Sequence, residues 1–370
     1  MIDKLIFEAP LNPLSMGNVS INILLSLYKK GIKVLYLPIG QPDIGNYKLT
    51  DDFKNWLQDA GNRFLREFKK TDVHLKNWHL AGSHAWVSDK RYLLTYHECS
   101  EATQEEINTV KNTTKTLFCG NYSPSIFKNF SDNVGTFNLG FDSNSFSKTN
   151  KKYFNDNRLQ WFLGGKAELR KNSWQILNLW AKKFGKKQGE SYKPGERMNF
   201  LNICIANPFY DINVQNQQIN QALEGQRYCN IQAFPFLGRE QFNDLLNSSD
   251  FDLTGLSSGE SWNLPAFNMT CLGKWSIVLN CTGQKSWSTS NNSIQISPNG
   301  MRSNIDNIFF HPNQPFNRGQ FYTFDPEEAN QAMQLAVDKY ADKPNIEGEK
   351  LQTEFTYDKT VDNILKEIEN

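Results

Sequence analysis

The sequence has almost no net charge, no C-x-x-C motif and no long hydrophobic run. A formal net charge of +1 over 370 residues gives no general electrostatic field, which argues against strong nonspecific binding to nucleic acid. The six cysteines lack the spacing of zinc ligands and are typical of reduced, packed thiols. No apolar run reaches the length of a membrane span, and residues 1–9 are too short and too charged for a signal peptide. We therefore expect a cytoplasmic protein with no transmembrane segment.

Aromatic residues are plentiful, at 13% of the chain. Tryptophan and tyrosine pack in cores and also line sugar-binding surfaces, so both roles remain open. The chain is long enough for two domains of ordinary size, each with its own core.

Short apolar runs alternate with helical patterns along most of the chain. Residues 4–9, a helix from about Asn18 and residues 32–39 predict a β-α-β unit, with Gly17 and Asn18 at a junction that an anionic group could approach. Further strands are expected at 92–96, 116–119, 137–140, 159–163, 200–206, 230–234, 251–256 and 275–279. Because helical patterns separate most of them, we predict an α/β chain with two doubly wound, Rossmann-like domains.

The polar stretch 143–157 has no period and predicts the linker between the domains. The expected domains are residues 1–145 and 146–325. Residues 326–370 carry two further helical patterns and either pack back on the first domain or are loosely held. Residues 282–306 show no regular pattern.

Two loops that follow predicted strands carry polar groups suited to a ligand. Residues 257–273 leave one strand through a Ser/Gly turn, present Glu260 and enter a helix at Leu264. Residues 163–172 leave another strand through glycines and present Lys166, Arg170 and Lys171. Open α/β sheets bind ligands at the carboxyl ends of their strands. The loops therefore predict a polyol whose hydroxyls meet Glu260 and a phosphate that meets the lysines.

Three other features each permit two interpretations. His97 and Glu98 follow strand 92–96, where they could bind or deprotonate a hydroxyl, or His97 could pair structurally with the adjacent loop. The amphipathic segment 53–70 has a basic side that suits either an anionic surface or simple solvent exposure. Asp250-Phe251-Asp252 is a D-x-D triplet, but its apolar context favours a chance match over a metal site.

The loop motifs resemble those of GT-B glycosyltransferases, and of glycosyltransferase family 4 in particular. Glu260-Ser-Trp-Asn-Leu-Pro265 matches the start of the family's Glu-Gly-Phe-Gly-Leu-Pro donor signature, and Cys271-Leu-Gly273 matches its end. The family's second acid is replaced by Asn268, which hydrogen-bonds a ribose more weakly than a carboxylate does. Gly165-Lys166 and Lys171 match the basic signature that holds the nucleotide diphosphate.

Softer similarities lie in the first half. Gly17 resembles the glycine-loop residue, Tyr96-His97-Glu98 stands where the family often has a sugar-binding His, and 139–142 resembles the Leu-Gly-Val-Asp that closes its first domain. The resemblance implies an acceptor-binding domain at 1–145, a donor-binding domain at 146–325 and a central cleft. We predict catalytic roles for Lys166, Lys171, Glu260 and His97, acceptor binding by Glu98, and donor binding by Gly17, Asn18, Gly165, Arg170, Ser261, Asn263, Leu264 and Asn268.

The resemblance implies transfer of a sugar from a nucleoside-diphosphate sugar to an acceptor hydroxyl, with retention and without a metal or another cofactor. The acceptor is a glycan, lipid, protein or DNA base. One alternative is a viral enzyme that glycosylates 5-hydroxymethylcytosine, which would place the protein in the host cytoplasm. Another is a binding protein that recognises a nucleotide or glycan without transferring anything, for which Asn268 is the only support.

Overall fold

The structure is a computed structural model that describes residues 2–192, 195–205 and 211–370. Its contacts divide the chain into two compact units. Unit 1 comprises residues up to Ser145 together with Asn307–Gly319 and Thr353–Asn370. Unit 2 comprises Phe146–Asp306 and Gln320–Gln352. The chain therefore crosses from one unit to the other several times.

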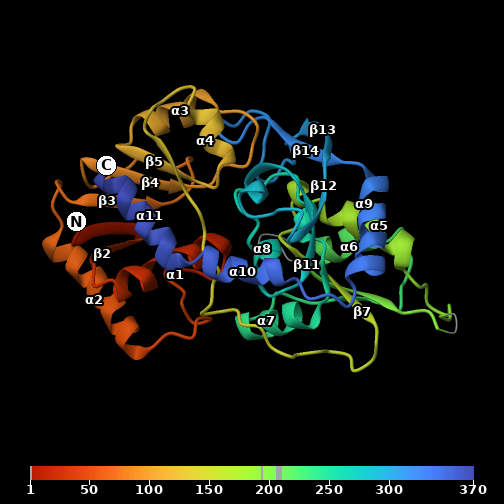
Figure 1. Cartoon of the computed structure of the whole chain (residues 1–370). Coiled ribbons are helices and arrows are strands. Elements are labelled where there is room, and N and C mark those ends of the chain that lie inside the picture. The colour runs from red at the N-terminus through yellow and green to blue at the C-terminus, as the bar shows by residue number, and fades with distance from the viewer. Residues whose placement is uncertain (1, 193–194, 206–210) are drawn as a thin grey trace. The chain divides into compact units, whose positions relative to one another are not determined.

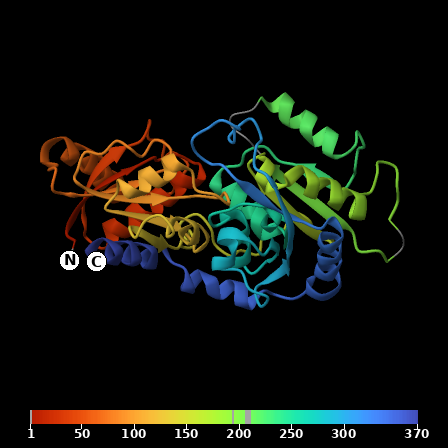
Figure 2. The same cartoon turned by 90° about the horizontal axis from the view of Figure 1, so that it is seen from above.

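Unit 1 contains a six-stranded parallel sheet (Figure 1), whose strand order is β2-β1-β3-β4-β5-β6. The strands are β1 (Lys4–Ala9), β2 (Lys33–Pro38), β3 (Val73–Asn77), β4 (Lys90–Thr95), β5 (Lys115–Cys119) and β6 (Val134–Phe137). The helices are α1 (Ser15–Lys29), α2 (Asp51–Glu67), α3 (Gln104–Lys111), α4 (Tyr122–Phe127) and α11 (Tyr357–Glu369). Helix α11 packs on α1 and β6, and the Ile2 amide donates to Glu369 at 3.0 Å, so both chain ends lie together in this unit (Figure 2).

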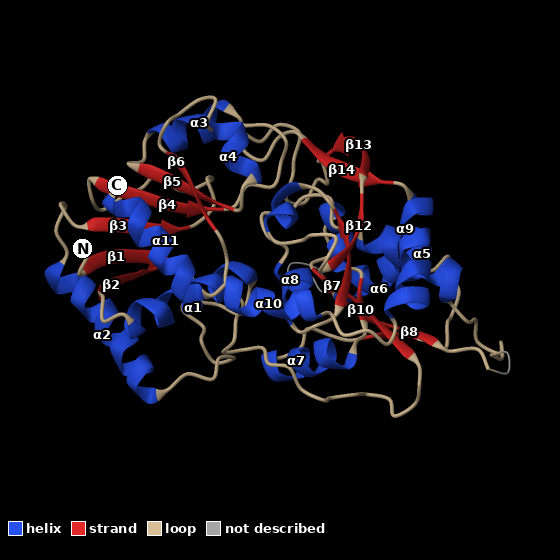
Figure 3. Cartoon of the chain, in the orientation of Figure 1, coloured by secondary structure: helices blue, strands red, loops and turns tan. Residues whose placement is uncertain are grey.

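Unit 2 contains a second six-stranded parallel sheet (Figure 3), whose strand order is β12-β11-β10-β7-β8-β9. The strands are β7 (Leu159–Gly165), β8 (Asn199–Ile205), β9 (Ile231–Ala233), β10 (Phe251–Asp252), β11 (Trp275–Leu279) and β12 (Ser293–Ile296), and a separate hairpin pairs β13 (Pro298–Ser303) with β14 (Gln320–Phe324). The helices are α5 (Ser173–Phe184), α6 (Ile212–Ala222), α7 (Arg239–Ser248), α8 (Leu264–Cys271), α9 (Pro326–Leu335) and α10 (Ile346–Glu354). The predicted α/β class with two Rossmann-like sheets is confirmed.

The central strands of unit 2 were predicted from their apolar runs because their side chains form the core of the unit. Trp161 on β7 and Trp180 on α5 are fully buried, and the Trp161 and Phe251 rings lie 4.5 Å apart between neighbouring strands. Helix α9 contributes Ala329 and Met333 to the same core. Of the terminal residues 326–370, those up to Gln352 therefore belong with unit 2, and only those from Thr353 onward belong with unit 1.

Strand β3 was missed by the sequence analysis because polar residues, His74 and Lys76, stand on both sides of its central Leu75. His74 and Lys76 are both buried, and their Nε2 and Nζ atoms lie 2.8 and 3.1 Å from Oε2 of Glu8 on the adjacent strand β1. The Lys76 ammonium also donates to the Ala85 carbonyl at 2.5 Å. A buried lysine is tolerated only when paired in this way, and its partner is distant in sequence.

Two further expectations about secondary structure were wrong, and one stretch without an expectation contains strands. The predicted strand 251–256 is strand only at Phe251–Asp252 and continues as a 3₁₀ turn at Thr254–Leu256. The predicted strand 137–140 is shifted to Val134–Phe137. The stretch 282–306, which has no sequence period, contains β12 and β13, because sheet pairing rather than side-chain alternation defines these strands.

Candidate functional site

The candidate site of unit 2 lies where the strand order of the sheet reverses. From β7 the chain proceeds to β8 and β9 on one side, then returns to β10, β11 and β12 on the other side of β7. The loops that follow β7 and β10 thus leave neighbouring strands at their carboxyl ends. This switch point is where doubly wound sheets bind their ligands.

Unusual backbone conformations turn both loops out of the sheet. Gly165 ends β7 with φ of +108°, a value that side chains rarely permit. Asn172 and Asn263 adopt left-handed conformations, with φ of 55° and 65°, at the starts of α5 and α8. Asparagine is enriched in this region among non-glycine residues, and both side chains are held by hydrogen bonds, that of Asn172 to the Leu256 carbonyl and that of Asn263 to the Thr254 carbonyl.

The two loops meet through a cluster of alternating charges. The Lys171 ammonium pairs with Oε1 of Glu260, and Arg170 Nη1 lies 3.1 Å from Oε2 of the same carboxylate. Arg170 Nε lies 2.7 Å from Oε2 of Glu168, and Lys166 Nζ lies 3.6 Å from the other oxygen of Glu168. The structure therefore brings together four predicted residues, Lys166, Arg170, Lys171 and Glu260, with three cations facing two carboxylates.

Both carboxylates of this cluster are ionised at neutral pH. Burial by itself raises the pKa of Glu260, but the nearby Lys171 and Arg170 charges outweigh it, so the pKa lies below its ordinary value. Burial likewise raises the pKa of Glu168, and Arg170, Lys166 and Lys171 together bring it below the ordinary value. The Lys166 side chain is 32% exposed and that of Lys171 12%, so Lys166 is the more accessible cation.

Hydrogen bonds fix the Glu260 carboxylate and its backbone. Ser257 Oγ donates to Glu260 Oε1 at 2.5 Å. The Glu260 amide donates to Thr282 Oγ1 at 3.1 Å, and its carbonyl accepts from the Gly283 amide at 2.8 Å. A Cβ at Gly283 would overlap the Ser261 carbonyl oxygen. The loop is therefore held against residues 282–283 by a close approach that requires glycine.

Of the predicted donor-binding residues in and just before α8, Ser261, Asn263 and Asn268 are buried in unit 2 and Leu264 is half-buried. Asn263 donates from Nδ2 to the Thr254 carbonyl at 2.9 Å and to Gln284 Oε1 at 2.7 Å. Leu264 begins the helix and Ser261 lies in the buried turn before it. Asn268 is also buried, and in the described part of the chain its Oδ1 has no hydrogen-bond partner.

The remaining predicted residues belong to unit 1. Gly17 lies in α1, where a Cβ would overlap the Asn12 backbone, and the adjacent Asn18 carbonyl accepts from Asn22 Nδ2 at 2.9 Å. His97 is buried, with Nε2 3.7 Å from Glu106 Oε2 and its ring edge-on to Phe127. Glu98, which is half-buried, follows His97 in the same loop.

Several residues of the site have no counterpart in the sequence prediction. Glu168 lies between the predicted cations Lys166 and Arg170 in the sequence. Its position within this charged run is the feature that could have indicated a role in the site. Ser257 lies within the predicted loop 257–273 but was not singled out there, whereas Thr282 and Arg302 contact the site from segments whose pairing depends on the fold. No local pattern identifies Thr282 or Arg302 as part of the site.

The D-x-D triplet does not present two carboxylates to one ligand. Asp250 accepts from the Gln160 amide and from Lys152, both at 2.8 Å, whereas Asp252 is buried and accepts from Thr254. Among residues 2–192, 195–205 and 211–370, no group of three His, Cys, Asp or Glu side chains is arranged to hold a metal ion. Within the same residues, no helix has both the length and the apolar character needed to cross a membrane.

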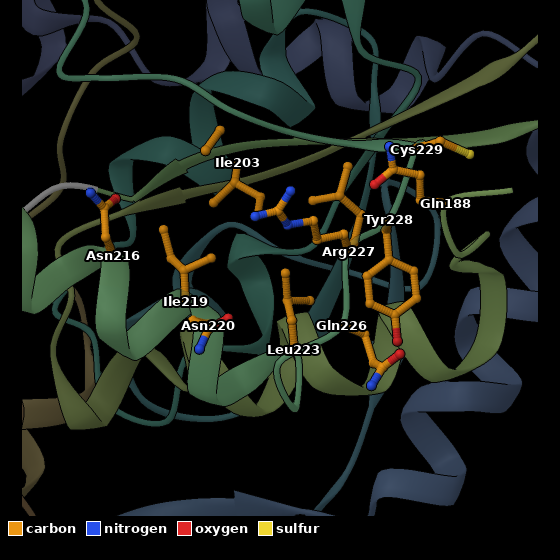
Figure 4. A pocket seen from close by; sticks show the side chains of 12 residues that line it. Gln188, Ile203, Asn216, Ile219, Asn220, Leu223, Gln226, Arg227, Tyr228 and Cys229 are labelled. Carbon is orange, nitrogen blue, oxygen red and sulfur yellow. The ribbon is translucent and has the colours of Figure 1, made fainter.

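A cavity of about 470 Å³ lies elsewhere in unit 2, beside α6 and the edge strand β9 (Figure 4). Ile203, Ile219 and Leu223 form its apolar wall, and Arg227 and Gln226 line it as well. None of the predicted site residues lines this cavity, so the charge cluster is the better candidate for the chemistry.

The two parallel sheets and the structural neighbours below identify the GT-B fold, a two-domain Rossmann-like architecture. No family model matches the sequence, and no curated protein matches it. Solved structures do match across almost the whole chain. Sucrose-phosphate synthase from Thermosynechococcus elongatus has a TM-score of 0.65 at 10% identity and covers 98% of this chain and 97% of its own.

Two further neighbours were solved with nucleotides. The catalytic domain of starch synthase IV from Arabidopsis thaliana, bound to ADP and acarbose, has a TM-score of 0.66 at 9% identity and covers 100% of this chain and 99% of its own. Anabaena HepE, in complex with UDP, has a TM-score of 0.59 at 11% identity, with 99% of each chain covered. At such low identities these similarities establish the fold.

Proposed function

We propose that this protein is a glycosyltransferase that moves a sugar from a nucleoside-diphosphate sugar to an acceptor hydroxyl. The observation that carries the proposal is the cluster of Lys166, Arg170, Lys171 and Glu260 at the switch point of the unit 2 sheet. Cations suit a diphosphate and a carboxylate suits sugar hydroxyls. The fold shared with glycosyltransferases supports the same conclusion.

Donor binding changes the partners within the cluster. In the structure, Glu260 partly neutralises Lys171 and Arg170. A diphosphate placed beside Lys166 and Lys171 competes for the Lys171 ammonium and leaves Glu260 Oε1 able to accept from a sugar hydroxyl. Ser257 and Arg170 continue to hold the carboxylate in place. The charge cluster thus preorganises both groups before the ligand arrives.

The transfer step needs stabilisation of charge on the departing phosphate. The bond between the anomeric carbon and the phosphate oxygen breaks, and the acceptor oxygen forms a bond to that carbon. The family 4 resemblance of the motifs predicts retention, in which the departing phosphate oxygen takes the proton of the acceptor hydroxyl. Lys166 and Lys171 stabilise the phosphate charge that develops, and this role requires no metal ion. His97 remains a predicted contact of the donor sugar, Glu98 of the acceptor, and Gly17 and Asn18 of the donor.

The experiment measures transfer and hydrolysis of UDP-glucose and ADP-glucose by the wild type and two variants. Lys171→Ala is expected to lower kcat by about 10²–10³-fold, the usual cost of removing one preorganised group that stabilises developing charge. Glu260→Gln should weaken sugar recognition and also reduce turnover. Lys182→Ala, which breaks an exposed ion pair with Glu224 in the same unit, is the matched control and should retain activity.

Full activity in both site variants would refute the assigned roles. An acceptor panel that includes simple glycans and 5-hydroxymethylcytosine duplex tests the DNA-base acceptor, and activity in EDTA tests the absence of a metal requirement. Tight nucleotide-sugar binding with neither hydrolysis nor transfer to any acceptor would instead favour a binding protein.

A further inference from the structure

The β13–β14 hairpin of unit 2 lies outside the six-stranded sheet and contacts the loop that carries the cations. Arg302, on β13, is half-buried. Its Nη2 donates to the Leu169 carbonyl at 2.7 Å and to Asn172 Oδ1 at 2.6 Å. These two acceptors flank Arg170 and Lys171 in the sequence, so one guanidinium group spans the turn that presents both cations.

Asn172 also hydrogen-bonds the loop that leads to Glu260, and so links that loop to Arg302. Its Nδ2 donates to the Leu256 carbonyl at 2.8 Å and to Ser258 Oγ at 2.7 Å. The charged Arg302 donor fixes which end of the Asn172 amide faces the hairpin, because only the oxygen can accept from it. The amide nitrogen is thereby directed at the loop that leads to Glu260.

The backbones of the two loops are joined at the same place. The Ser258 amide donates to the Arg170 carbonyl at 2.7 Å, and the Ser258 carbonyl accepts from the Tyr322 amide of β14 at 3.3 Å. Both strands of the hairpin thus contact the region where the cation loop meets the carboxylate loop. Neither contact involves the side-chain atoms that pair Lys171 with Glu260.

We propose that Arg302 is a positioning residue that sets the register of the Lys166–Lys171 loop against the Ser257–Glu260 loop. The proposal rests on the glycosyltransferase function inferred for the same site. Arg302 acts through Leu169 and Asn172 and contributes no atom to the reaction. Its loss allows the turn at Leu169–Asn172 to shift, so the Lys171 ammonium and the Glu260 carboxylate no longer occupy their preorganised positions.

Steady-state kinetics with UDP-glucose and ADP-glucose test the consequence for turnover. Arg302→Ala is expected to lower kcat by about 100-fold, the effect of a misplacement of about 1 Å in a preorganised site, with little change in KM. Arg302→Lys retains one charged donor and should restore part of kcat. Met301→Ala is the matched control, because Met301 precedes Arg302 on the same strand and is 41% exposed.

Hydrogen exchange tests the positioning role without relying on activity. In Arg302→Ala, the amides of Asn172 and Ser258 should exchange faster, because their acceptors lie on the loosened turn, while amides of the β8 core strand stay as protected as in the wild type. Unchanged exchange at Asn172 and Ser258 would overturn the proposal, as would a kcat equal to that of the wild type in an active enzyme. If the wild type turns over neither donor, the proposed function is contradicted. The exchange data still test the positioning role of Arg302 in that case.

Discussion

The buried carboxyl of Asp252 predicts a measurable dependence of stability on pH. Asp252 lies at the end of β10, and burial raises its pKa from 3.8 to about 6 despite hydrogen bonds from the Thr254 amide and hydroxyl. Because the folded-state pKa is raised, the unfolded chain releases this proton more readily than the folded chain does. Asp252 therefore reduces the free energy of unfolding as the pH rises from 3.8 to about 6.

The magnitude follows from the shift itself. About two pKa units at 1.36 kcal/mol each correspond to about 3 kcal/mol in total, of which about 2 kcal/mol falls between roughly pH 4.5 and 7.5. Asp252→Asn removes the titration while an amide oxygen still accepts from Thr254. The difference in unfolding free energy between variant and wild type should thus move in favour of the variant by about 2 kcal/mol over that interval.

Urea unfolding followed by circular dichroism at roughly pH 4.5 and 7.5 measures this difference. The control is Asp325→Asn in the same unit, where the aspartate caps α9 through its side chain and asparagine caps a helix equally well. A stability difference between Asp252→Asn and the wild type that is independent of pH would refute the reasoning.

Two other predictions concern the site. Gly283→Ala should destabilise unit 2 and impair donor binding, because the new Cβ would overlap the Ser261 carbonyl; thermal unfolding and UDP calorimetry check this, and wild-type values in both would contradict it. Lys171→Met and Glu260→Gln should each cost less than the about 3–5 kcal/mol of breaking an isolated buried pair, because Arg170 remains paired with Glu260 in the first variant and with Glu168 in the second. The double variant should cost less stability than the sum of the two single variants, since it removes both charges of the Lys171–Glu260 pair. A double-mutant cycle measured by chemical unfolding tests this, and strictly additive costs would contradict it.

The sequence predicted the elements whose own residues define them. The apolar runs at 4–9, 159–163 and 275–279 all lie in strands of the structure, because a strand buried on both faces leaves a continuous hydrophobic signature. Helix α9 likewise begins at Pro326 behind a capping Asp325, as its sequence indicates. In contrast, β3 could not be predicted, because a lysine such as Lys76 is typical of an exposed position. Its burial depends on the ion pair with Glu8, which the tertiary structure provides.

The sequence by itself also determined which chemical groups the chain offers: a loop with three cations, and a loop with a glutamate before a helix, each after a strand. Tertiary structure alone decided that they meet. Lys171 and Glu260 are 89 positions apart, and they pair because β10 inserts beside β7 at the point where the strand order reverses. That choice depends on hydrogen bonds between distant strands and on the packing of a shared core. No local pattern records such contacts, and the Arg302 contact that spans the cation loop depends on them in the same way.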